Sequence, residues 1–391
     1  MKNVRLLVGL VLALSLTIAP QAFAAKYKKF GVDQRHEAIQ KELRTIKPSS
    51  KVFHWKMVMP WSKGLLFYDF AQHFADTVKL ASGGRLDIKV FSAGELVPAM
   101  QTFDAVSKGE AQVGHDWPGY WKGKDEDFVP FGDVPFGLDM EGYNIWLYQR
   151  GGLQQMQKLY GKYNLVDFPC GQSGQDMGLF SNKKATKMSD FKGMRVRTVG
   201  WYMDILNKMG VSVSPLPGGS VYLALERGVI DAAEFSSPAM DLPMGFADIT
   251  KYVIEPGVHQ PASQCTVFFN KDAWNQLPDD LKWIVKTSAK ETQLWSEAWM
   301  QNLDAEAILK FKKKVQFVTM DDATLNAFRK TTHEYLNGLK AKYPEVKKTL
   351  DSQEKFEKDF APWREIRSRV TPWPYKTYIS GHQSSTGHHL Q

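Results

Sequence analysis

The sequence is poor in cysteine, with only Cys170 and Cys265 among 391 residues. Outside the cytoplasm an even number of cysteines permits one disulfide, but two in a chain of this length exclude a small fold held together by disulfides. Both cysteines lie in apolar or strand-like stretches. A bridge between them and a pair of buried free thiols are therefore both compatible with the sequence.

Motifs that mark many enzyme classes are also absent. The chain has no Gly-rich phosphate loop, no G-x-S-x-G elbow, no H-E-x-x-H and no paired Cys-x-x-Cys. An enzyme needs a nucleophile or a general base with an orienting partner, and the sequence displays neither. Five histidines between residues 50 and 340 are scattered singly, and we expect them to be structural: His54, His73, His115, His259 and His333.

Long apolar runs are confined to the N-terminus. Lys2 and Arg5 flank the start of an apolar run at 6–18, and Ala22 and Ala24 supply the small residues that a signal peptidase needs. This run is too short to span a bilayer, and no later stretch is apolar enough to do so. We therefore predict a signal peptide over residues 1–24, cleaved near Ala24, and export of the remaining chain.

Basic residues are not concentrated on any one segment. The net charge of +8 falls to +6 when the two basic residues of the signal peptide are removed (8 − 2), and the densest basic cluster is only residues 310–314. A nucleic-acid partner would require a basic stripe or patch. We therefore expect no nucleic-acid binding.

Alternating helix and strand patterns begin after a charged extension at 25–50. Apolar residues recur every three or four positions in a helix and every second position in a strand. The first section accordingly reads β-α-β-α-β, with strands at 53–59, 86–90 and 111–115 and helices at 67–81 and 98–108. An aromatic and Gly-rich loop at 117–137 follows, then a helix at 143–160 and a strand at 165–170. These elements predict a first α/β lobe at 51–170.

A second α/β unit is centred on residues 191–241. A strand at 194–198, a helix at 201–209, a Pro-Gly-Gly turn at 217–219 and a strand ending at 231–234 predict a βαβ alternation. Ligands of such sheets lie beyond the carboxyl ends of the strands, where Arg197 and Glu234 would fall. Arg195 and Arg197 share one face of their strand, so one or both could fork a carboxylate. Surface salt bridges are the alternative.

The last third of the chain is predominantly helical. A strand predicted at 262–269 leads back to the first lobe, and a helix of about 35 residues starts at Asp279. At 1.5 Å per residue it would reach about 50 Å, so it must brace two lobes or pair with another chain. We predict lobe 2 at 171–261, the spanning helix at 278–313, a strand at 315–319, C-terminal helices within 320–372 (322–342 and 355–368), and a disordered tail at 373–391.

Five segments in a fixed order carry a family resemblance. They read SGGRLDIKVFSAGELVPAMQTFDAVSKGEAQVG, GYWKGKDEDFVPFGDVPFG, FKGMRVRTVG, PGGSVYLALERGVIDAAEF and PGVHQPAS, and the match runs from about residue 51 to 317. The chain resembles the extracytoplasmic solute receptors of TRAP transporters, closest to the branch that binds 2-oxo acids and lactate. The resemblance implies a periplasmic α/β protein of two lobes, with hinge strands and a long helix spanning both lobes. It would capture a small organic acid and deliver it to TRAP permease membrane subunits.

Site residues follow from the same resemblance. Arg197 would pair with the substrate carboxylate, and the Tyr120 hydroxyl would contact the ligand. From residue types alone, Asp176 and Glu234 could form a hard oxygen site for Na⁺ or Ca²⁺. The resemblance places the metal there, with the main-chain carbonyl of Phe235 as a further ligand and the ion bridging protein and substrate.

Other positions depart from the family pattern or complete the site. Gln175 is assigned to substrate binding, and Trp201, Phe180 and Phe235 are expected to form apolar walls. Asp176 stands where the family has Gln, and the added negative charge should favour Ca²⁺ over Na⁺. Phe235 replaces a Trp, and Ser220 stands where related sequences often carry Glu, so the substrate could differ from pyruvate or lactate.

Two other functions and one assembly are compatible with the sequence. An exported metal-dependent enzyme could act on small carboxylates through Asp176 and Glu234. A scaffold or sensory protein could use the aromatic C-terminal helices. Trp295, Trp299 and the segment 356–373 also offer enough aromatic surface for a homodimer through the C-terminal helices, unless these residues pack on their own chain.

Overall fold

The computed structural model describes residue 41 and residues 48–370. The signal peptide expected at 1–24, most of the extension and the tail at 373–391 lie outside the described residues. The chain divides into two compact units. In one of them, which contains Pro278–Trp283, the Ser49 amide donates to the Asp280 carboxylate at 3.3 Å. The other unit, Val52–Leu277 with the chain from Ile284 onward, carries everything discussed below.

The first sheet has five strands in the order β2-β1-β3-β10-β4. Strand β1 pairs in parallel with β2 and β3, whereas β10 runs antiparallel to β3 and β4. The elements of this region are β1 (Phe53–Val58), α3 (Leu66–Ala81), β2 (Leu86–Phe91), η2 (Ala99–Gln101), α4 (Thr102–Ser107), β3 (Val113–Asp116), η3 (Pro118–Gly123), η4 (Glu126–Phe131), α5 (Met140–Gln149), α6 (Gly152–Gly161) and β4 (Leu165–Ser173). The predicted β-α-β-α-β order of the first section is confirmed.

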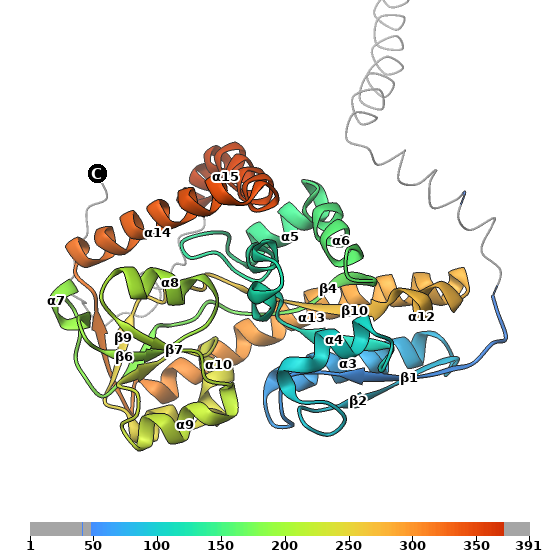
Figure 1. Ribbon diagram of the computed structural model, residues 1–391, viewed down its shortest axis with the longest axis horizontal. Helices are drawn as coiled ribbons and strands as arrows, with labels where there is room; N and C mark the ends of the chain where they lie inside the picture. The colour runs from blue at the N-terminus through green and yellow to red at the C-terminus, as the bar shows by residue number, and fades with distance from the viewer. Residues whose placement is uncertain (1–40, 42–47, 371–391) are drawn as a thin grey trace, which may run out of the picture. The chain divides into compact units, whose positions relative to one another are not determined.

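The second sheet has six strands in the order β11-β9-β5-β8-β6-β7. Its strands are short, and Figure 1 shows them beside the helices of the green and yellow part of the chain. The elements are β5 (Leu179–Ser181), α7 (Met188–Phe191), β6 (Arg195–Arg197), α8 (Gly200–Lys208), β7 (Ser212–Ser214), α9 (Gly218–Glu226), β8 (Ala232–Ala233), α10 (Pro238–Asp241), η5 (Leu242–Met244), α11 (Phe246–Ile249) and β9 (Tyr252–Glu255). The predicted βαβ alternation around Arg197 is confirmed.

Two adjacent strands and one long helix connect the sheets. Strand β4 precedes β5 of the second sheet, and β10 (Ser263–Asn270) returns from β9 and pairs antiparallel with β4. Helix α13 (Asp279–Phe311) has 33 residues, about 50 Å at 1.5 Å per residue. Its Trp295 ring lies 6.3 Å from Phe70 of α3, and its Phe311 ring lies 5.3 Å from Phe180 of β5. The helix therefore braces both lobes, as predicted from its length.

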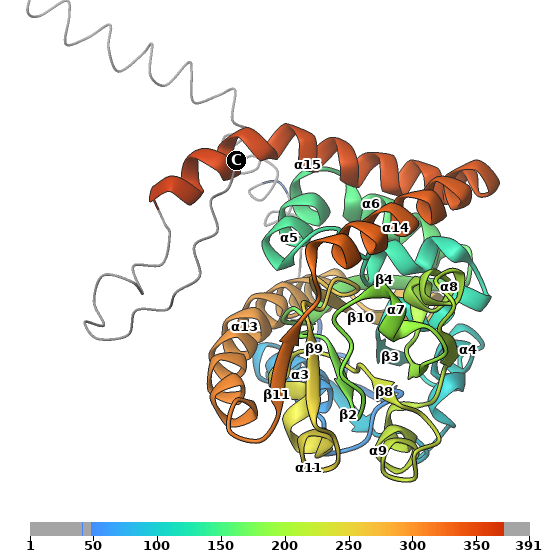
Figure 2. The same ribbon diagram turned by 90° about the vertical axis from the view of Figure 1, so that its left-hand side faces the viewer.

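The C-terminal helices pack on both halves of the chain. After α12 (Lys271–Gln276), α13 and β11 (Gln316–Thr319), the chain forms α14 (Asp322–Lys342) and α15 (Pro344–Val370). Figures 1 and 2 both show α15 beside α5 and α6, which it contacts. Side chains of α14 and α15 join Val129 and Trp201 in one hydrophobic cluster. None of the helices in the described part of the chain is long and apolar enough to cross a bilayer.

Local conformation explains most differences from the sequence-based elements. The single helix expected at 143–160 is two helices, α5 and α6, because Gly151 between them adopts a φ of +86°. The last helix begins at Pro344 rather than near residue 355. Strands β5, β7 and β9 have only three or four residues, too few for alternation to be recognised. Cys170 and Cys265 are both buried free thiols, so the disulfide alternative is wrong.

Backbone-to-backbone packing holds the segment after β4 against the segment after β9. A Cβ on Gly178, whose φ is +138°, would lie 2.0 Å from the Ile254 carbonyl oxygen. A Cβ on Gly257 would lie 2.1 Å from the Asp176 carbonyl oxygen. The Asp176 amide donates to the Gln260 carbonyl at 3.0 Å. Only glycine permits this approach, and it places Asp176 beside the loop at 256–262.

Substitution of Gly178 by Ala should therefore be costly. Strain at a positive φ and displacement of the Ile254 backbone should together lower the free energy of unfolding by about 2–5 kcal/mol. Urea denaturation followed by circular dichroism measures this change. The control is Gly161→Ala at the end of α6, where an added Cβ meets no atom within 4 Å and stability should be unchanged or slightly higher. Equal stability of the two variants would contradict the packing argument.

Candidate functional site

A buried arginine lies at the centre of the candidate site. Arg197 ends β6, its side chain is 2% exposed, and pairing of β6 with β8 brings it next to Glu234. Arg197 Nη1 donates to the Glu234 carbonyl at 2.8 Å and to its carboxylate at 3.1 Å, and Nε donates to the Leu216 carbonyl at 3.0 Å. The strand register thus fixes the guanidinium, and Nη2 takes part in none of these three bonds.

An aromatic ring covers one side of this guanidinium. The Arg197 guanidinium carbon lies 5.5 Å from the centre of the Phe235 ring, which is a cation–π contact. The Phe235 ring also meets the Phe67 ring of α3 edge to face at 6.3 Å. A Cβ on Gly218 would come within 2.5 Å of the Phe235 ring, so the Pro-Gly-Gly turn leaves the space that this ring occupies.

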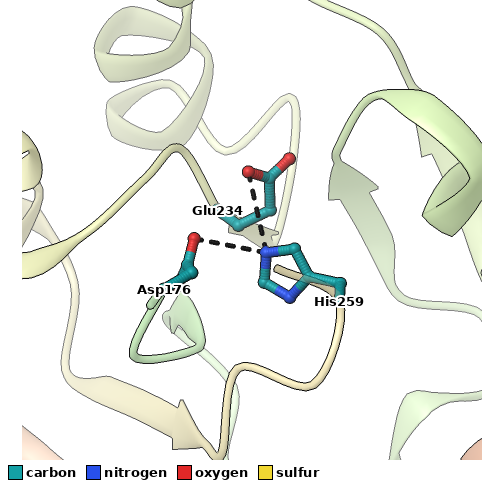
Figure 3. A group of neighbouring side chains, drawn as sticks. All are labelled: Asp176, Glu234 and His259. Atoms are coloured by element: carbon teal, nitrogen blue, oxygen red, sulfur yellow. Dashed lines mark hydrogen bonds and ion pairs between the residues drawn. The ribbon is translucent and has the colours of Figure 1, made fainter. Parts of the chain in front are cut away.

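Two carboxylates and an imidazole meet beside Arg197. Figure 3 shows the side chains of Asp176 and Glu234 pointing toward His259. His259 Nε2 lies 3.2 Å from Asp176 Oδ2 and 3.8 Å from Glu234 Oε2, and all three residues are almost completely buried. The second Asp176 oxygen accepts the Gly178 amide at 2.7 Å. One potential ligand atom from each of the three residues lies within 4.8 Å of the others.

Burial and neighbouring charge shift the ionisation of these groups. Burial raises the pKa of Asp176, and the His259 charge opposes this effect. Burial lowers the pKa of His259, but the Asp176, Glu234 and Asp133 carboxylates outweigh it, so its net pKa is raised. The imidazole is therefore held toward its protonated form, in which both nitrogens donate. His259 acts as a counter-ion to the two acids and stacks on the Tyr202 ring at 4.6 Å.

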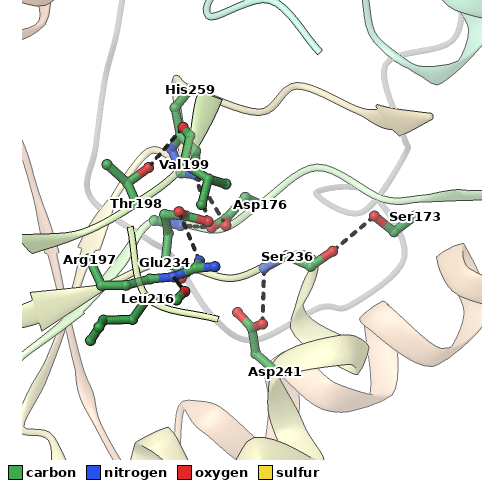
Figure 4. A network of polar contacts seen from close by, with 11 residues as sticks. Ser173, Asp176, Arg197, Thr198, Val199, Leu216, Glu234, Ser236, Asp241 and His259 are labelled. Atoms are coloured by element: carbon green, nitrogen blue, oxygen red, sulfur yellow. Dashed lines mark hydrogen bonds and ion pairs between the residues drawn. The ribbon is translucent and has the colours of Figure 1, made fainter. Parts of the chain in front are cut away.

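Further buried carboxyl groups surround this cluster. Burial raises the pKa of Asp133 and of Asp241 well above the usual range, and the charges of Asp176 and Glu234 add to both shifts. In Figure 4 the Asp241 carboxylate accepts the Ser236 amide, at 3.1 Å. Both carboxyl groups are therefore held toward their uncharged form.

This donor set suits a hard cation. Ca²⁺ binds carboxylate and carbonyl oxygens, and Asp176 and Glu234 offer carboxylates within reach of one ion. A bound cation would also favour the charged form of the neighbouring acids. The protonated His259 is a hydrogen-bond donor rather than a ligand in this state. The arrangement can bind and hold an anion at Arg197 and a cation at the two carboxylates.

Two adjacent cavities open on Arg197. The larger has a volume of about 390 Å³, and the smaller has a volume of about 20 Å³. Trp61, Tyr120, Arg197 and Val199 line both of them. The walls therefore come from both lobes: Trp61 and Tyr120 from the first, Arg197 and Val199 from the second.

A family model for "Bacterial extracellular solute-binding protein, family 7" matches residues 57–342. The chain belongs to this receptor family. The receptor is 33% identical to a monocarboxylate 2-oxoacid-binding periplasmic protein of Nostoc sp., over 84% of this chain and 90% of that protein. The chain is therefore a solute receptor by family, and the resemblance to TRAP receptors is confirmed.

Solved structures of TRAP receptors share the fold. One from Pseudoalteromonas atlantica, with bound sodium and pyruvate, matches with a TM-score of 0.79 at 30% identity, covering 84% of this chain and all of that chain (100%). Another, from Bordetella bronchiseptica, is a dimer with calcium and picolinate and matches with a TM-score of 0.78 at 30% identity, covering 84% and 97%. The predicted two-lobed α/β class is confirmed, and the family gives no support to the enzyme alternative.

The receptor brings most of the predicted site residues together. Arg197, Glu234, Asp176 and Phe235 form one contiguous group, and the Tyr120 hydroxyl accepts the Trp61 indole N–H at 3.1 Å at the wall of both cavities. Burial raises the pKa of Tyr120 to about 12, so its hydroxyl stays protonated. Arg197 bonds directly to Glu234, so the cation and one of the predicted metal ligands form an ion pair in this structure.

Three predicted residues of the receptor lie elsewhere. Gln175 is exposed and lines neither cavity. Trp201 is buried, but its indole N–H donates to Glu126 at 2.7 Å, and its ring packs in the cluster with α14 and α15. Phe180 lies among the rings of Phe246 and Phe311. Arg195 forks Asp231 at the surface, as the salt-bridge alternative expected.

The sequence-based set missed one central residue of the receptor. His259 was interpreted as one of several structural histidines, although it lies in the segment PGVHQPAS that carries part of the family resemblance. Asp133 and Trp61 were also missed, because isolated acids and aromatics in loops carry no periodic signal. The ordered motif was the signal that could have identified His259.

Proposed function

We propose that this receptor binds a small 2-oxo or 2-hydroxy monocarboxylate in the periplasm and delivers it to TRAP permease membrane subunits. The observation that carries the proposal is the buried Arg197 guanidinium, which lines both cavities with Nη2 outside its protein bonds. Nη2 carries two N–H donors on a guanidinium that is always charged, so it can pair with a carboxylate. Two relatives have pyruvate or picolinate bound, and a third is named as a monocarboxylate 2-oxoacid-binding protein. All three support a small monocarboxylate as the ligand. Cleavage of the signal peptide near Ala24 belongs to this proposal.

Binding would couple the ligand to closure of the two lobes. Arg197 and Phe235 hold the ligand from the second lobe, while Trp61 and the Tyr120 hydroxyl contact it from the first. A ligand that contacts both lobes favours the closed arrangement because it gains more interactions there. The apolar rings exclude water from the Arg197–carboxylate pair and so strengthen it.

A cation is part of the proposed site. Asp176, Glu234 and the Phe235 main-chain carbonyl would hold Ca²⁺ or Na⁺, and the bound ion would supply a second positive charge to the substrate oxygens. Asp176 adds a full negative charge, which favours the divalent ion. His259 orients the Asp176 carboxylate through its 3.2 Å contact. Gln175 and Trp201 have no place in this arrangement.

The carboxylate assignment predicts a ligand-dependent stabilisation that requires Arg197. A 2-oxo acid at about 100 times its Kd should stabilise the wild-type protein by about 2.7 kcal/mol, seen as a higher Tm, without being consumed. Arg197→Ala should lose this shift, because the guanidinium that pairs with the ligand carboxylate is removed. The matched control, Arg195→Ala, removes an exposed arginine of the same strand and should keep it. An undiminished shift in Arg197→Ala, or formation of product, would count against the receptor mechanism.

With Ca²⁺, the ion that Asp176 favours, the cation assignment predicts that chelation weakens substrate binding. EDTA should raise the Kd measured by calorimetry, and Glu234→Gln should weaken binding at least tenfold by removing a charged ligand. Asp176→Asn should reduce the stabilisation by Ca²⁺ more than that by Na⁺, because it removes the extra charge. Glu226→Gln, on the exposed side of α9, serves as control. A substrate Kd that is unchanged by the chelator and by both site variants would contradict the cation assignment.

A homodimer through the C-terminal helices is the remaining element of the proposal. Trp295 and Trp299 stack on each other at 4.8 Å and meet the Phe70 ring within their own chain, so we place the dimer surface elsewhere. Trp363 and Ile366 lie three residues apart on α15, and each is more than half exposed. Two large apolar side chains exposed side by side on a helix mark a candidate interface. Dimer formation by the Bordetella bronchiseptica relative supports the idea.

Sedimentation velocity at micromolar concentration tests this assembly. The wild-type chain should sediment as a dimer, and Trp363→Ser with Ile366→Ser should sediment as a monomer, because the apolar contact is lost. Leu309→Ser, which removes an exposed leucine of α13, is the control and should leave the dimer intact. A monomeric wild type would show that the exposed side chains of α15 do not drive pairing.

A further inference from the structure

The larger cavity extends away from the acid cluster. Only the smaller cavity reaches Phe235, Gln260 and Ser263, and the Gln260 carbonyl accepts the amide of Asp176. The larger one instead follows residues 60–65, 99–100 and 215–219. Arg197 lies on the boundary of both. A ligand carboxylate held at Arg197 would therefore have the acid cluster on one side and this larger cavity on the other.

The lining of the larger cavity is almost entirely apolar. Leu65, Met100, Met203, Pro215 and Leu216 contribute to it, and none of the described residues that line it is an acid. Among these described residues, Arg197 and Lys122 are the charged ones. The Lys122 ammonium is already neutralised by an ion pair with Asp204 of α8. The chemistry of these walls matches an uncharged apolar group, and Arg197 Nη2, which takes part in none of the three bonds described above, is the donor left for one carboxylate.

The cavity is also larger than a three-carbon acid requires. Pockets that bury most of a drug-sized ligand typically measure roughly 300–1,000 Å³, and this one measures about 390 Å³. Pyruvate or lactate would leave most of that space unfilled. An apolar side chain would fill it and remove the apolar walls from water.

We propose that the substrate of this receptor is a 2-oxo or 2-hydroxy monocarboxylate with a branched aliphatic or aromatic side chain. This inference rests on the proposed function. The carboxylate pairs with Arg197, the oxygen on the second carbon faces the acid cluster, and the side chain enters the larger cavity against Leu65, Met100 and Met203.

Affinity across a series of 2-oxo acids tests the proposal. Isothermal titration of the wild-type protein would compare pyruvate, 2-oxobutanoate, 2-oxopentanoate, 4-methyl-2-oxopentanoate and phenylpyruvate. Each buried methylene should lower the Kd by roughly fourfold, so 4-methyl-2-oxopentanoate and phenylpyruvate should bind at least tenfold more tightly than pyruvate. 2-Oxoglutarate, which places a second carboxylate in the apolar cavity, should bind more weakly than 2-oxopentanoate.

A variant that fills the cavity separates the side chain from the carboxylate. Met203→Trp should weaken binding of phenylpyruvate at least tenfold and leave pyruvate within about threefold, since one bulky side chain then occupies the space of another. Leu223→Trp, on the exposed face of α9 and outside both cavities, is the matched control and should change neither Kd. Far-ultraviolet circular dichroism and Tm identify any variant that fails to fold; Leu65→Phe then provides a smaller filling substitution.

Several results would overturn the inference. Affinities that stay flat or fall from pyruvate to phenylpyruvate would mean that the cavity is a water-filled cleft. Tighter binding of 2-oxoglutarate, lost in Lys122→Ala, would assign the cavity to a second carboxylate. In both cases Arg197-dependent binding of pyruvate would persist and the proposed function would stand. If no acid of the series binds, the proposed function itself fails.

Discussion

The buried ion pair between Arg197 and Glu234 is the constraint on which the site depends. Removing two charges from water costs several kcal/mol per ion, and attraction between them offsets this only with further hydrogen bonds. Here the carbonyls of Leu216 and Glu234 provide those bonds. Parallel pairing of β6 with β8 puts both partners at the same end of the second sheet. The 215–219 turn and Phe235 enclose this pair: the Leu216 carbonyl accepts from Arg197 Nε, and the Phe235 ring covers the guanidinium.

The connection between the lobes places the remaining acids around that pair. The antiparallel pair β4 and β10 carries the chain out of the first sheet and back, and the segments that follow β4 and precede β10 contain Asp176 and His259. Helix α13 reinforces both regions, since Ser296 accepts the Gln172 amide and Asp304 accepts the Ala239 amide. Burial raises the pKa of Asp304 to about 6. A single helix thus touches the backbone of each lobe close to the site.

Much of this architecture was predictable because periodicity reports burial. The β-α-β-α-β section, the βαβ unit at Arg197, the bracing helix and α14 all follow from apolar spacing, and Arg197 with Glu234 follows from their place at strand ends. The break at Gly151, the strands of three residues and the early start of α15 depend on tertiary contacts that spacing does not encode. The same limit explains Gln175 and Trp201, whose side chains line neither cavity. It also explains His259, which only the fold brings between Asp176 and Glu234.

The bonds from Nε and Nη1 of Arg197 to its own chain have a consequence for molecular recognition. An arginine free in solution must give up several rotamers when it captures an anion, and each immobilised long side chain costs about 0.5–1.5 kcal/mol. Here the Leu216 and Glu234 carbonyls have already imposed that order during folding. An acid bound as proposed would therefore meet a rigid, preorganised cation, and the entropy of ordering this arginine would not be subtracted from its affinity.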